Sequence, residues 1–300
     1  MTAQASIPVD LFNPGQVFAC VGFLEAAEVL FGSAEGGFDW TKQAQPCFEI
    51  HTRGEQNPFS GVLEFLIEAE LKRLVPKGYI DPPAKKKQKK VDEQVDNDEA
   101  NSSAGDGPIC TVETFPAREA DRLALPLRLE RNGRSLDVTH WCDASSRNSF
   151  KLFAGQQRSA AIARQMIAVL SRLWQEQQNA LIQDPFGVTA PLGGSSFKFD
   201  ARKAWTAIDA GYSPDEQKHV VQASPAVELL AAIGLEHARP DEFETRKVRY
   251  GVWQGLLPPT LARPALGGVR VGARLRVFRF TLELAGKNKV VTFAQEEANV

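Results

Sequence analysis

The run His140-Trp141-Cys142-Asp143 combines residue types that catalysis and metal binding often use. A thiol beside a histidine could form a nucleophile with its base, and with Cys47 and His51 the run could supply the ligands of a zinc site. The spacing supports neither strongly, because the cysteines lie far apart and form no Cys-x-x-Cys pair. A core histidine and a buried thiol are the more common interpretation. We therefore predict no catalytic residue, no metal and no other cofactor, and keep a nuclease that uses His51 or His140 as an alternative.

Phosphate-binding loops and hydrolase signatures are not visible in the sequence. The glycine pairs Gly193-Gly194 and Gly267-Gly268 lack the lysine of a P-loop and the glycine spacing of a dinucleotide-binding fold. The chain also has neither the Gly-x-Ser-x-Gly pattern of a nucleophile elbow nor the His-Glu-x-x-His pattern of a zinc helix. The glycine pairs indicate turns, and hydrolase motifs give no support for an enzyme.

The strongest local signal is electrostatic and lies near the C-terminus. Residues 246–282 contain no Asp or Glu, although the whole chain has a formal net charge of −2. Arginine dominates the basic residues of this stretch, and its planar guanidinium pairs with phosphate and stacks on bases. If residues 273–284 form a strand, Arg274 and Arg276 share a face with Phe278 and Phe280, as basic groups beside aromatic rings do in single-strand binders. The nucleic-acid-binding residues predicted here are Arg249, Trp253, Arg270, Arg274, Arg276 and Arg279.

A second basic group consists of Arg147, Lys151 and Arg158. Gly155-Gln156-Gln157 leads from it into a predicted helix, whose free N-terminal amides could hold a phosphate. We include Lys151 and Arg158 among the candidate nucleic-acid contacts. For both basic groups the alternative is a surface whose cations pair with acids elsewhere in the chain or with a protein partner, as in a purely protein-binding scaffold.

Composition restricts the class of protein. With 300 residues and 43% apolar content the chain can bury a large core, and its near-neutral charge requires any nucleic-acid site to be local. No apolar stretch is long enough to cross a membrane, and residues 1–10 lack the features of a signal peptide, so we expect a cytoplasmic protein without a membrane partner. Residues 81–107 contain a lysine run followed by acids and no aromatic residue, which predicts a disordered charged insertion.

The apolar spacing predicts several helices. Asn13-Pro14 should cap and begin a helix with a single apolar stripe that ends at Gly32, and Ser60 should cap a second helix over 61–75. A long helix should follow Gly155, and another should begin after Ser224 and continue until Gly234 and Pro240 break the pattern.

Strands are predicted between these helices. Leucines alternate from 123 to 129, Asn132-Gly133 suits a type I′ turn, and the alternation resumes at Leu136, which together predict a hairpin. Its register pairs Leu129 with Leu136 and extends far enough to bury His140. Further strands are expected over residues 48–52, 195–199, 248–253, 269–284 and 289–293.

These elements indicate an α+β fold of mixed helices and antiparallel hairpins with one disordered insertion. We divide the chain into an N-terminal helical part (1–80), the insertion (81–107) and an α+β part (108–300) that forms one continuous fold with the first.

Several segments, taken in order, resemble the large subunit of the type I-G (formerly I-U) CRISPR Cascade complex. They are Val9-Asp10-Leu11-Phe12-Asn13-Pro14-Gly15-Gln16-Val17-Phe18-Ala19-Cys20, Phe153-Ala154-Gly155-Gln156-Gln157, Phe197-Lys198-Phe199-Asp200 with Ala204-Trp205, Ser224 to Leu235, and Tyr250-Gly251-Val252-Trp253 with Leu257-Pro258-Pro259. The resemblance implies a non-catalytic subunit of an RNA-guided complex in antiviral DNA interference. Such a subunit helps read the motif flanking the target, holds DNA and recruits the helicase-nuclease. The implied partners are the other Cascade subunits, the CRISPR guide RNA, target DNA and the helicase-nuclease effector.

Overall fold

The computed structural model describes residues 1–41, 45–81, 107–142, 150–192, 196–204 and 221–297. Most of the predicted insertion lies outside the described residues. Its two ends are described, and the buried Arg73 holds them together: the guanidinium makes a bidentate ion pair with Asp81 and donates a hydrogen bond of 2.8 Å to the Gly107 carbonyl. Arg73 therefore keeps the two ends of the insertion next to each other on the main fold.

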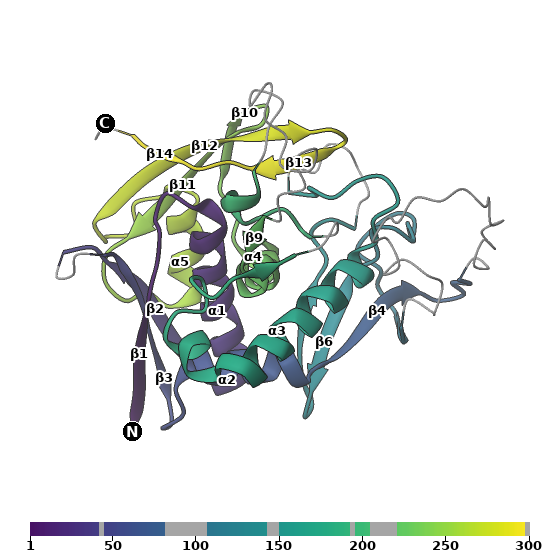
Figure 1. Cartoon of the computed structure of the whole chain (residues 1–300), viewed down its shortest axis with the longest axis horizontal. Helices are drawn as coiled ribbons and strands as arrows, with labels where there is room; N and C mark the ends of the chain where they lie inside the picture. Colours follow the sequence, from purple (N-terminus) through teal and green to yellow (C-terminus); the bar gives the residue numbers. More distant parts are fainter. Residues whose placement is uncertain (42–44, 82–106, 143–149, 193–195, 205–220, 298–300) are drawn as a thin grey trace.

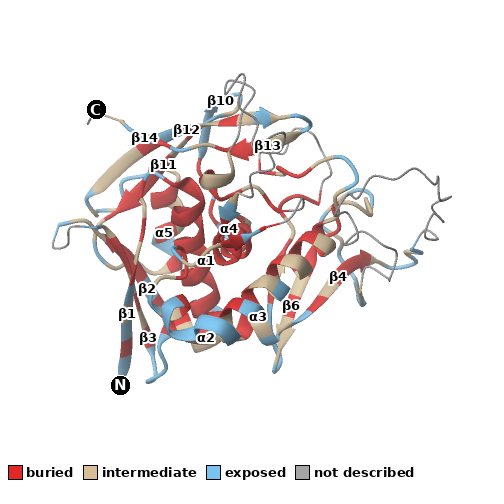
Figure 2. Cartoon of the chain, in the orientation of Figure 1, coloured by how far each residue is buried: buried red, intermediate tan, exposed pale blue. Residues whose placement is uncertain are grey.

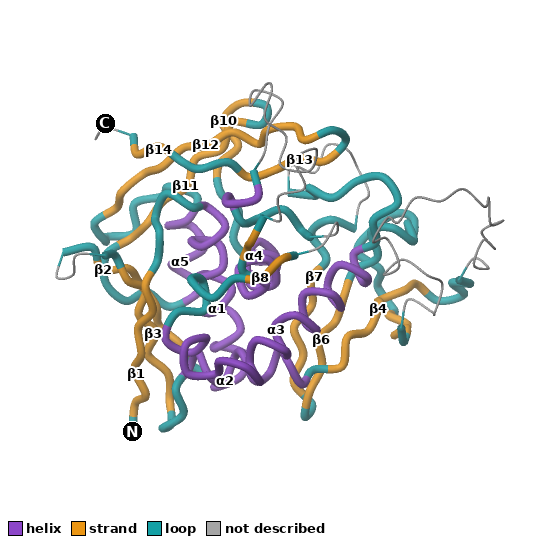
Figure 3. Tube along the Cα trace, in the orientation of Figure 1, coloured by secondary structure: helices purple, strands orange, loops and turns teal. Residues whose placement is uncertain are grey.

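The fold is α+β, as predicted: some helices lie in the interior with sheets around them, and others lie along one edge of the molecule (Figures 1 and 3). The helices are α1 (Pro14–Phe31), α2 (Pro58–Glu68), α3 (Ser159–Gln183), α4 (Pro225–His237) and α5 (Pro259–Leu266), with a 3-10 turn η2 (Ala201–Lys203). The strands of the first half are β1 (Thr2–Pro8), β2 (Ala34–Asp39), β3 (Cys47–Arg53), β4 (Glu70–Pro76), β5 (Ile109–Val112), β6 (Leu127–Arg131) and β7 (Arg134–Val138). Those of the second half are β8 (Ala190–Pro191), β9 (Gln222–Ala223), β10 (Asp241–Glu244), β11 (Lys247–Trp253), β12 (Leu275–Ala285), β13 (Asn288–Val291) and β14 (Gln295–Glu296).

The strands form separate sheets that each face the central helices. One sheet has the order β1-β3-β2, a second has the order β5-β4-β6-β7, and the C-terminal sheet has the order β10-β11-β12-β13. The short strand β14 also pairs with β12, and β8 pairs with β9. Because β4 lies before the insertion and β5 and β6 after it, the second sheet joins the two parts of the chain.

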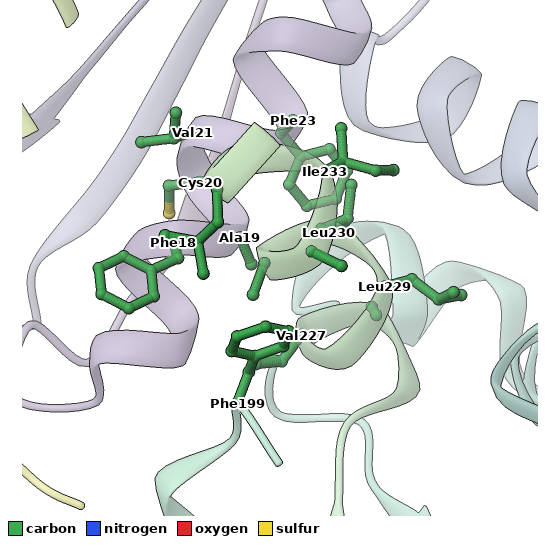
Figure 4. Close-up of a cluster of buried hydrophobic side chains, with 14 of the residues drawn as sticks. Phe18, Ala19, Cys20, Val21, Phe23, Phe199, Val227, Leu229, Leu230 and Ile233 are labelled. Carbon is green, nitrogen blue, oxygen red and sulfur yellow. The ribbon is translucent and has the colours of Figure 1, made fainter. Parts of the chain in front are cut away.

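The centre of the core is the contact between α1 and α4, which run close together through the interior (Figures 2 and 4). Two glycines permit this approach: a Cβ on Gly22 would overlap the Leu230 carbonyl oxygen, and a Cβ on Gly234 would overlap that of Phe18. Gly234 therefore serves helix packing and does not end α4, contrary to the prediction, whereas the end of α4 at His237 agrees with the predicted break at Pro240. Helix α1 is buried around most of its circumference and has no single apolar stripe. Contrary to the expectation from the sequence, it is apolar and long enough to cross a membrane, and 78% of it is buried inside the fold.

The hairpin prediction is confirmed between Leu127 and Val138, but the paired register stops there and His140 lies in a turn after β7. Leu129 pairs with Leu136, and Arg128 pairs with Asp137 through a bidentate ion pair. Asn132 and Gly133 both have positive φ angles, as a type I′ turn requires. The cap of α4 is also confirmed, because the Ser224 hydroxyl accepts a hydrogen bond from the Val227 amide.

Other predictions were wrong where tertiary contacts outweigh local pattern. The expected helix over 61–75 is α2 followed by the strand β4, and Asn57, not Ser60, caps α2 by accepting from two backbone amides. Residues 196–199 do not form a strand, since Lys198 has a φ of 71°. The helix α5 was missed inside a region expected to be β-like, and residues 1–80 are mixed, not mainly helical.

Candidate nucleic-acid interface

The C-terminal sheet places the predicted arginines on two different faces of β11 and β12. In the antiparallel register Arg249 lies opposite Arg279, and Val252 lies opposite Arg276. Arg276 therefore shares the inner face with Phe278 and Phe280, as the alternation predicted, whereas Arg249 and Arg279 lie on the outer face. The predicted set is thus split by the sheet.

The inner face does not offer aromatic rings to a ligand. Phe278 and Phe280 are buried, and both pack around the buried Tyr250 of β11. Trp253 is fully buried as well: its ring lies edge-on to Phe38, and its indole N–H donates a hydrogen bond of 2.9 Å to the Gly36 carbonyl. The prediction that Trp253 binds nucleic acid is therefore wrong, because its ring and its indole N–H are both used inside the core.

Carboxylates at the C-terminus engage two of the predicted arginines. Arg276 forms a bidentate pair with Glu296, with N···O distances of 2.7 and 2.6 Å. Arg249 forms a similar pair with Glu297 at 2.8 and 3.0 Å, and it lies 3.7 Å from Asp241. Hydrogen bonds from Arg276 lower the pKa of the Glu296 carboxyl, and the hydrogen bonds that Arg249 and Arg276 donate to the two glutamates raise the pKa of each arginine.

The positive charge of the acid-free stretch is therefore compensated by acids on either side of it in the sequence and by Glu25 of α1. Arg263 pairs with Glu25 of α1 at 2.7 Å through both nitrogens, and Lys247 pairs with Glu244 of β10 at 2.8 Å. The sequence contains this signal in the acids at 241–244 and 296–297, on either side of the 246–282 window. Arg249, Arg263, Arg276 and Lys247 thus pair with acids of the same chain, which was the alternative to nucleic-acid binding.

Arg274 and Arg279 differ from the others. Both are exposed, and neither forms an ion pair with another residue that the structure describes. Arg279 lies directly opposite Arg249, and two like charges at a directly opposed pair repel each other unless anions lie nearby. Arg270 is exposed too, but unlike Arg274 and Arg279 it already interacts with another group of the chain. Arg274 and Arg279 are thus the best-placed cations for an external anion.

The second basic group is less suited to binding a phosphate. The amide and hydroxyl of Ser159, at the start of α3, donate to the Leu123 and Leu125 carbonyls. Lys151 lies 5.1 Å from the ring centroid of Phe153, and both Lys151 and Arg158 are partly buried and have contacts. Arg147 lies outside the described residues.

The enzyme-like residues are placed apart. His140 is buried against Trp141, and Cys142 is buried after β7, whereas Cys47 and His51 lie on β3 in another sheet. His51 lies 2.6 Å from Glu49. Over the described ranges, no group of three or more His, Cys, Asp or Glu side chains is arranged to hold a metal ion.

Glu236 of α4 joins the end of the hairpin to the core. Its carboxylate accepts hydrogen bonds from the Thr139 hydroxyl and amide at 2.6 Å and from the His140 amide at 2.9 Å. Burial alone would raise the pKa of Glu236, but the hydrogen bonds from His140 and Thr139 outweigh it and lower this pKa to about 2. These hydrogen bonds form a structural joint between α4 and the end of the hairpin.

The segments that carry the family resemblance meet in the interior. Asn13 does not cap α1 with its side chain; its amide group donates to the Asp200 carboxylate at 3.0 Å, and its oxygen accepts from the Ala201 amide. Asp200 also accepts from the Ser224 amide at 3.0 Å and makes an ion pair with Arg202. The buried Glu228 of α4 accepts from the Asp200 amide, and burial raises the pKa of its carboxyl.

Sequence reasoning missed the aromatic rings that do reach the surface near the arginines. Phe12 is 43% exposed and Phe243 is 41% exposed. The Arg249 guanidinium lies 4.4 Å from the ring centroid of Phe243, and that of Arg276 lies 5.4 Å from the ring centroid of Trp40. Phe12 and Trp40 come from loops distant in sequence. Isolated bridges from β2 to residues 254 and 257, and the hydrogen bond from the Ala294 amide to the Phe12 carbonyl, connect these loops to the C-terminal part of the chain.

The chain matches no protein-family model, no curated protein and no solved structure. The resemblance to type I-G large subunits therefore depends on the ordered segments themselves. Four of them contribute to one packed interior: Asn13, Asp200 and Ser224 share a hydrogen-bond network, and the Tyr250 hydroxyl donates to the Leu11 carbonyl at 2.7 Å. These contacts are buried, so they stabilise the fold and do not themselves form an exposed binding site.

Proposed function

We propose that this chain is a non-catalytic, nucleic-acid-binding subunit of a cytoplasmic RNA-guided CRISPR interference complex similar to type I-G Cascade. In this role it holds DNA, helps read the motif flanking the target and recruits the helicase-nuclease. The base pairing of the guide supplies most of the sequence specificity in such systems, so the protein needs backbone contacts more than a base code.

The observation that carries the proposal is the pair of exposed arginines on and beside β12. Arg274 and Arg279 have no carboxylate partner within the described part of the chain. Arg276 lies between them and is held by a half-exposed glutamate that a phosphate can replace, since both anions accept the same bidentate pair. Arg274 and Arg276, two positions apart, offer contacts to neighbouring phosphates of one strand, and Arg279 adds an exposed cation on the opposite face of β12.

A salt titration tests this surface. Replacing both Arg274 and Arg279 with Ala should weaken binding of single-stranded DNA and reduce the slope of log affinity against log salt by about 2, with little change in sequence preference. The matched control replaces Arg53 and Arg118, two exposed arginines outside the C-terminal sheet, and should leave the slope unchanged. Equal effects of the two double variants would contradict the proposed surface.

Assembly is a separate test. Co-expression with the Cascade backbone subunits and a guide RNA should yield one complex that contains this chain, and removing the chain should abolish DNA interference while guide processing continues. Interference that persists without the chain would contradict the assigned role, whatever the outcome of the salt titration.

A protein-binding scaffold is the second candidate. It is favoured by the neutralisation of Arg249 and Arg276 by Glu297 and Glu296, which leaves less free positive charge than the sequence alone indicates. An unchanged salt slope in a folded Arg274→Ala, Arg279→Ala variant, combined with loss of assembly, would favour this candidate over nucleic-acid binding.

A further inference from the structure

A cavity lies at the edge of the C-terminal sheet where β12 approaches the start of α1. Its volume is about 390 Å³, within the ~300–1,000 Å³ typical of small-molecule sites. The lining residues are Val9, Asp10, Leu11, Phe12, Gln45, Pro46 and Arg276. Two further cavities, of about 170 and 150 Å³, lie elsewhere on the described surface and lack this combination of an exposed aromatic ring and an arginine beside other cations.

The apolar part of this cavity has the form of a stacking platform. Phe12 packs edge-on against the buried Phe278, with ring centroids 5.4 Å apart at an interplanar angle of 89°, which fixes the orientation of its ring. The Arg276 guanidinium lies 5.2 Å from the centroid of Phe278 and 5.4 Å from that of Trp40. An exposed and oriented aromatic ring beside an arginine is the arrangement that single-strand binders use for one base.

The polar part can pair with the edge of a base. Gln45 is exposed, and its amide offers both a donor and an acceptor. Asp10 uses one carboxylate oxygen to accept from the Phe12 amide, and its other oxygen remains an acceptor. Arg276 uses Nε and Nη2 for Glu296, while Nη1 makes no hydrogen bond to a described residue. These groups lie around the lining of the cavity, as the partners of a flat, polar-edged ligand must.

The C-terminal segment connects this cavity to the arginines. The Ala294 amide donates to the Phe12 carbonyl at 2.7 Å, and Glu296 holds Arg276. A strand of nucleic acid whose phosphates contact Arg274 and Arg276 passes this cavity, because Arg276 is part of its lining.

We propose that the cavity bounded by Phe12, Gln45 and Arg276 binds one unpaired nucleobase. This inference deepens the proposed function and rests on it. The base stacks on the Phe12 ring, and its polar edge meets the side chains of Asp10, Gln45 and Arg276. The source of the base is a single strand whose backbone lies on the arginine surface; a free nucleotide offers the same ring chemistry with only one phosphate.

The test separates base from backbone. Full-length protein is titrated with a short single-stranded oligonucleotide and with the same strand in which all bases are removed. Wild type should bind the intact strand about 5- to 150-fold more tightly, which corresponds to the ~1–3 kcal/mol of one stacked base. In Phe12→Leu this difference should largely disappear, while the salt slope stays that of wild type. Gln45→Ala, a change at an exposed side chain, should reduce the difference partly.

Phe243→Leu is the matched control, because Phe243 is equally exposed and also lies beside an arginine that a C-terminal glutamate holds, but it does not line the cavity. It should keep the full base-dependent difference. An equal loss in Phe243→Leu, or an unchanged difference in Phe12→Leu and Gln45→Ala, overturns this inference and leaves the arginine surface standing. A wild-type protein that binds no strand overturns the proposed function as well. Competition by a nucleoside monophosphate at the affinity of the strand would assign the cavity to a free nucleotide and overturn the single-strand source.

Discussion

Carboxylates hold arginines in two regions of this molecule, and the surroundings of the pairs differ. In the interior, Asp200 is 1% exposed and is bound at once by Asn13, Arg202 and the Ser224 amide. On the C-terminal sheet, Arg276 and Glu296 form an equally short bidentate pair, but both side chains remain in contact with solvent. The carboxylate partner of the arginine is therefore fixed in the interior, whereas on the sheet an external anion can replace it.

The cost of desolvation explains this difference. A buried carboxylate that loses a partner has no water to replace it, so the network around Asp200 can only exist complete. A half-exposed pair contributes little because water already solvates both charges, and replacing the carboxylate by a phosphate costs correspondingly little. The interior network thus specifies the fold, whereas the sheet retains arginines that an external anion can use.

Breaking the interior network should have the largest effect. Replacing Asp200 with Ala removes the acceptor for Asn13 and Ser224 and leaves Arg202 unpaired, so the free energy of unfolding should fall by about 3–5 kcal/mol in chemical denaturation. Asp137→Ala is the control, because Asp137 forms a bidentate pair with Arg128 on a half-exposed strand. It should cost about 1 kcal/mol or less. Equal losses would remove the distinction between the two kinds of pair.

Glu236 allows a pH test of the interior. Its pKa of about 2 lies below the ordinary 4.5, so its contribution to stability is complete above pH 4.5 and is lost as the pH falls towards 2. The shift corresponds to about 3 kcal/mol at neutral pH. Wild type should therefore lose stability between about pH 5 and pH 2, and Glu236→Gln should be less stable at pH 7 and show a smaller further loss.

The control for this measurement is Glu176→Gln. Glu176 is exposed on α3 and lies 3.9 Å from Arg172, so its removal should leave both the stability at pH 7 and the acid profile near those of wild type. If Glu236→Gln has the same acid profile as wild type, the joint between α4 and the hairpin does not depend on this charge.

Local signals in the sequence were enough for much of the fold. The hairpin register follows from leucine alternation and the Asn132-Gly133 turn, and the cap at Ser224 follows from one residue type before a proline. Where the prediction failed, the decisive partner lies far away in sequence. Residues 70–76 form a strand because β5 and β6 pair with them, and Gly234 stays helical because Phe18 packs against it.

The candidate site was harder to predict for the same reason. Alternation correctly placed Arg276 with Phe278 on one face of β12. It could not predict whether this face is exposed to solvent or packs against α1. The pairing of Arg249 and Arg276 with the last described residues depends on how β14 returns to β12. Phe12 lay inside a segment that had been identified by family resemblance, and its exposure is a property of the assembled sheet edge.

Replacing the C-terminal glutamates should have the smallest effect on stability. It also tests most directly whether their pairs with arginine differ from the interior pairs around Asp200. Replacing Glu296 and Glu297 with Gln removes two charges from half-exposed pairs, so the free energy of unfolding should change by about 1 kcal/mol or less. The same change frees Arg276 for phosphate and leaves Arg249 with only its longer contact to Asp241, so affinity for single-stranded DNA should rise and the salt slope should steepen by up to about 2. Glu244→Gln is the control, because Glu244 is an exposed acid of the same sheet that holds Lys247, outside the arginine surface of β12. It should leave the slope nearly unchanged. A glutamate double variant that unfolds as readily as Asp200→Ala would make the C-terminal pairs part of the structural core, and one that is stable but binds no better than wild type would show that these arginines do not contact nucleic acid.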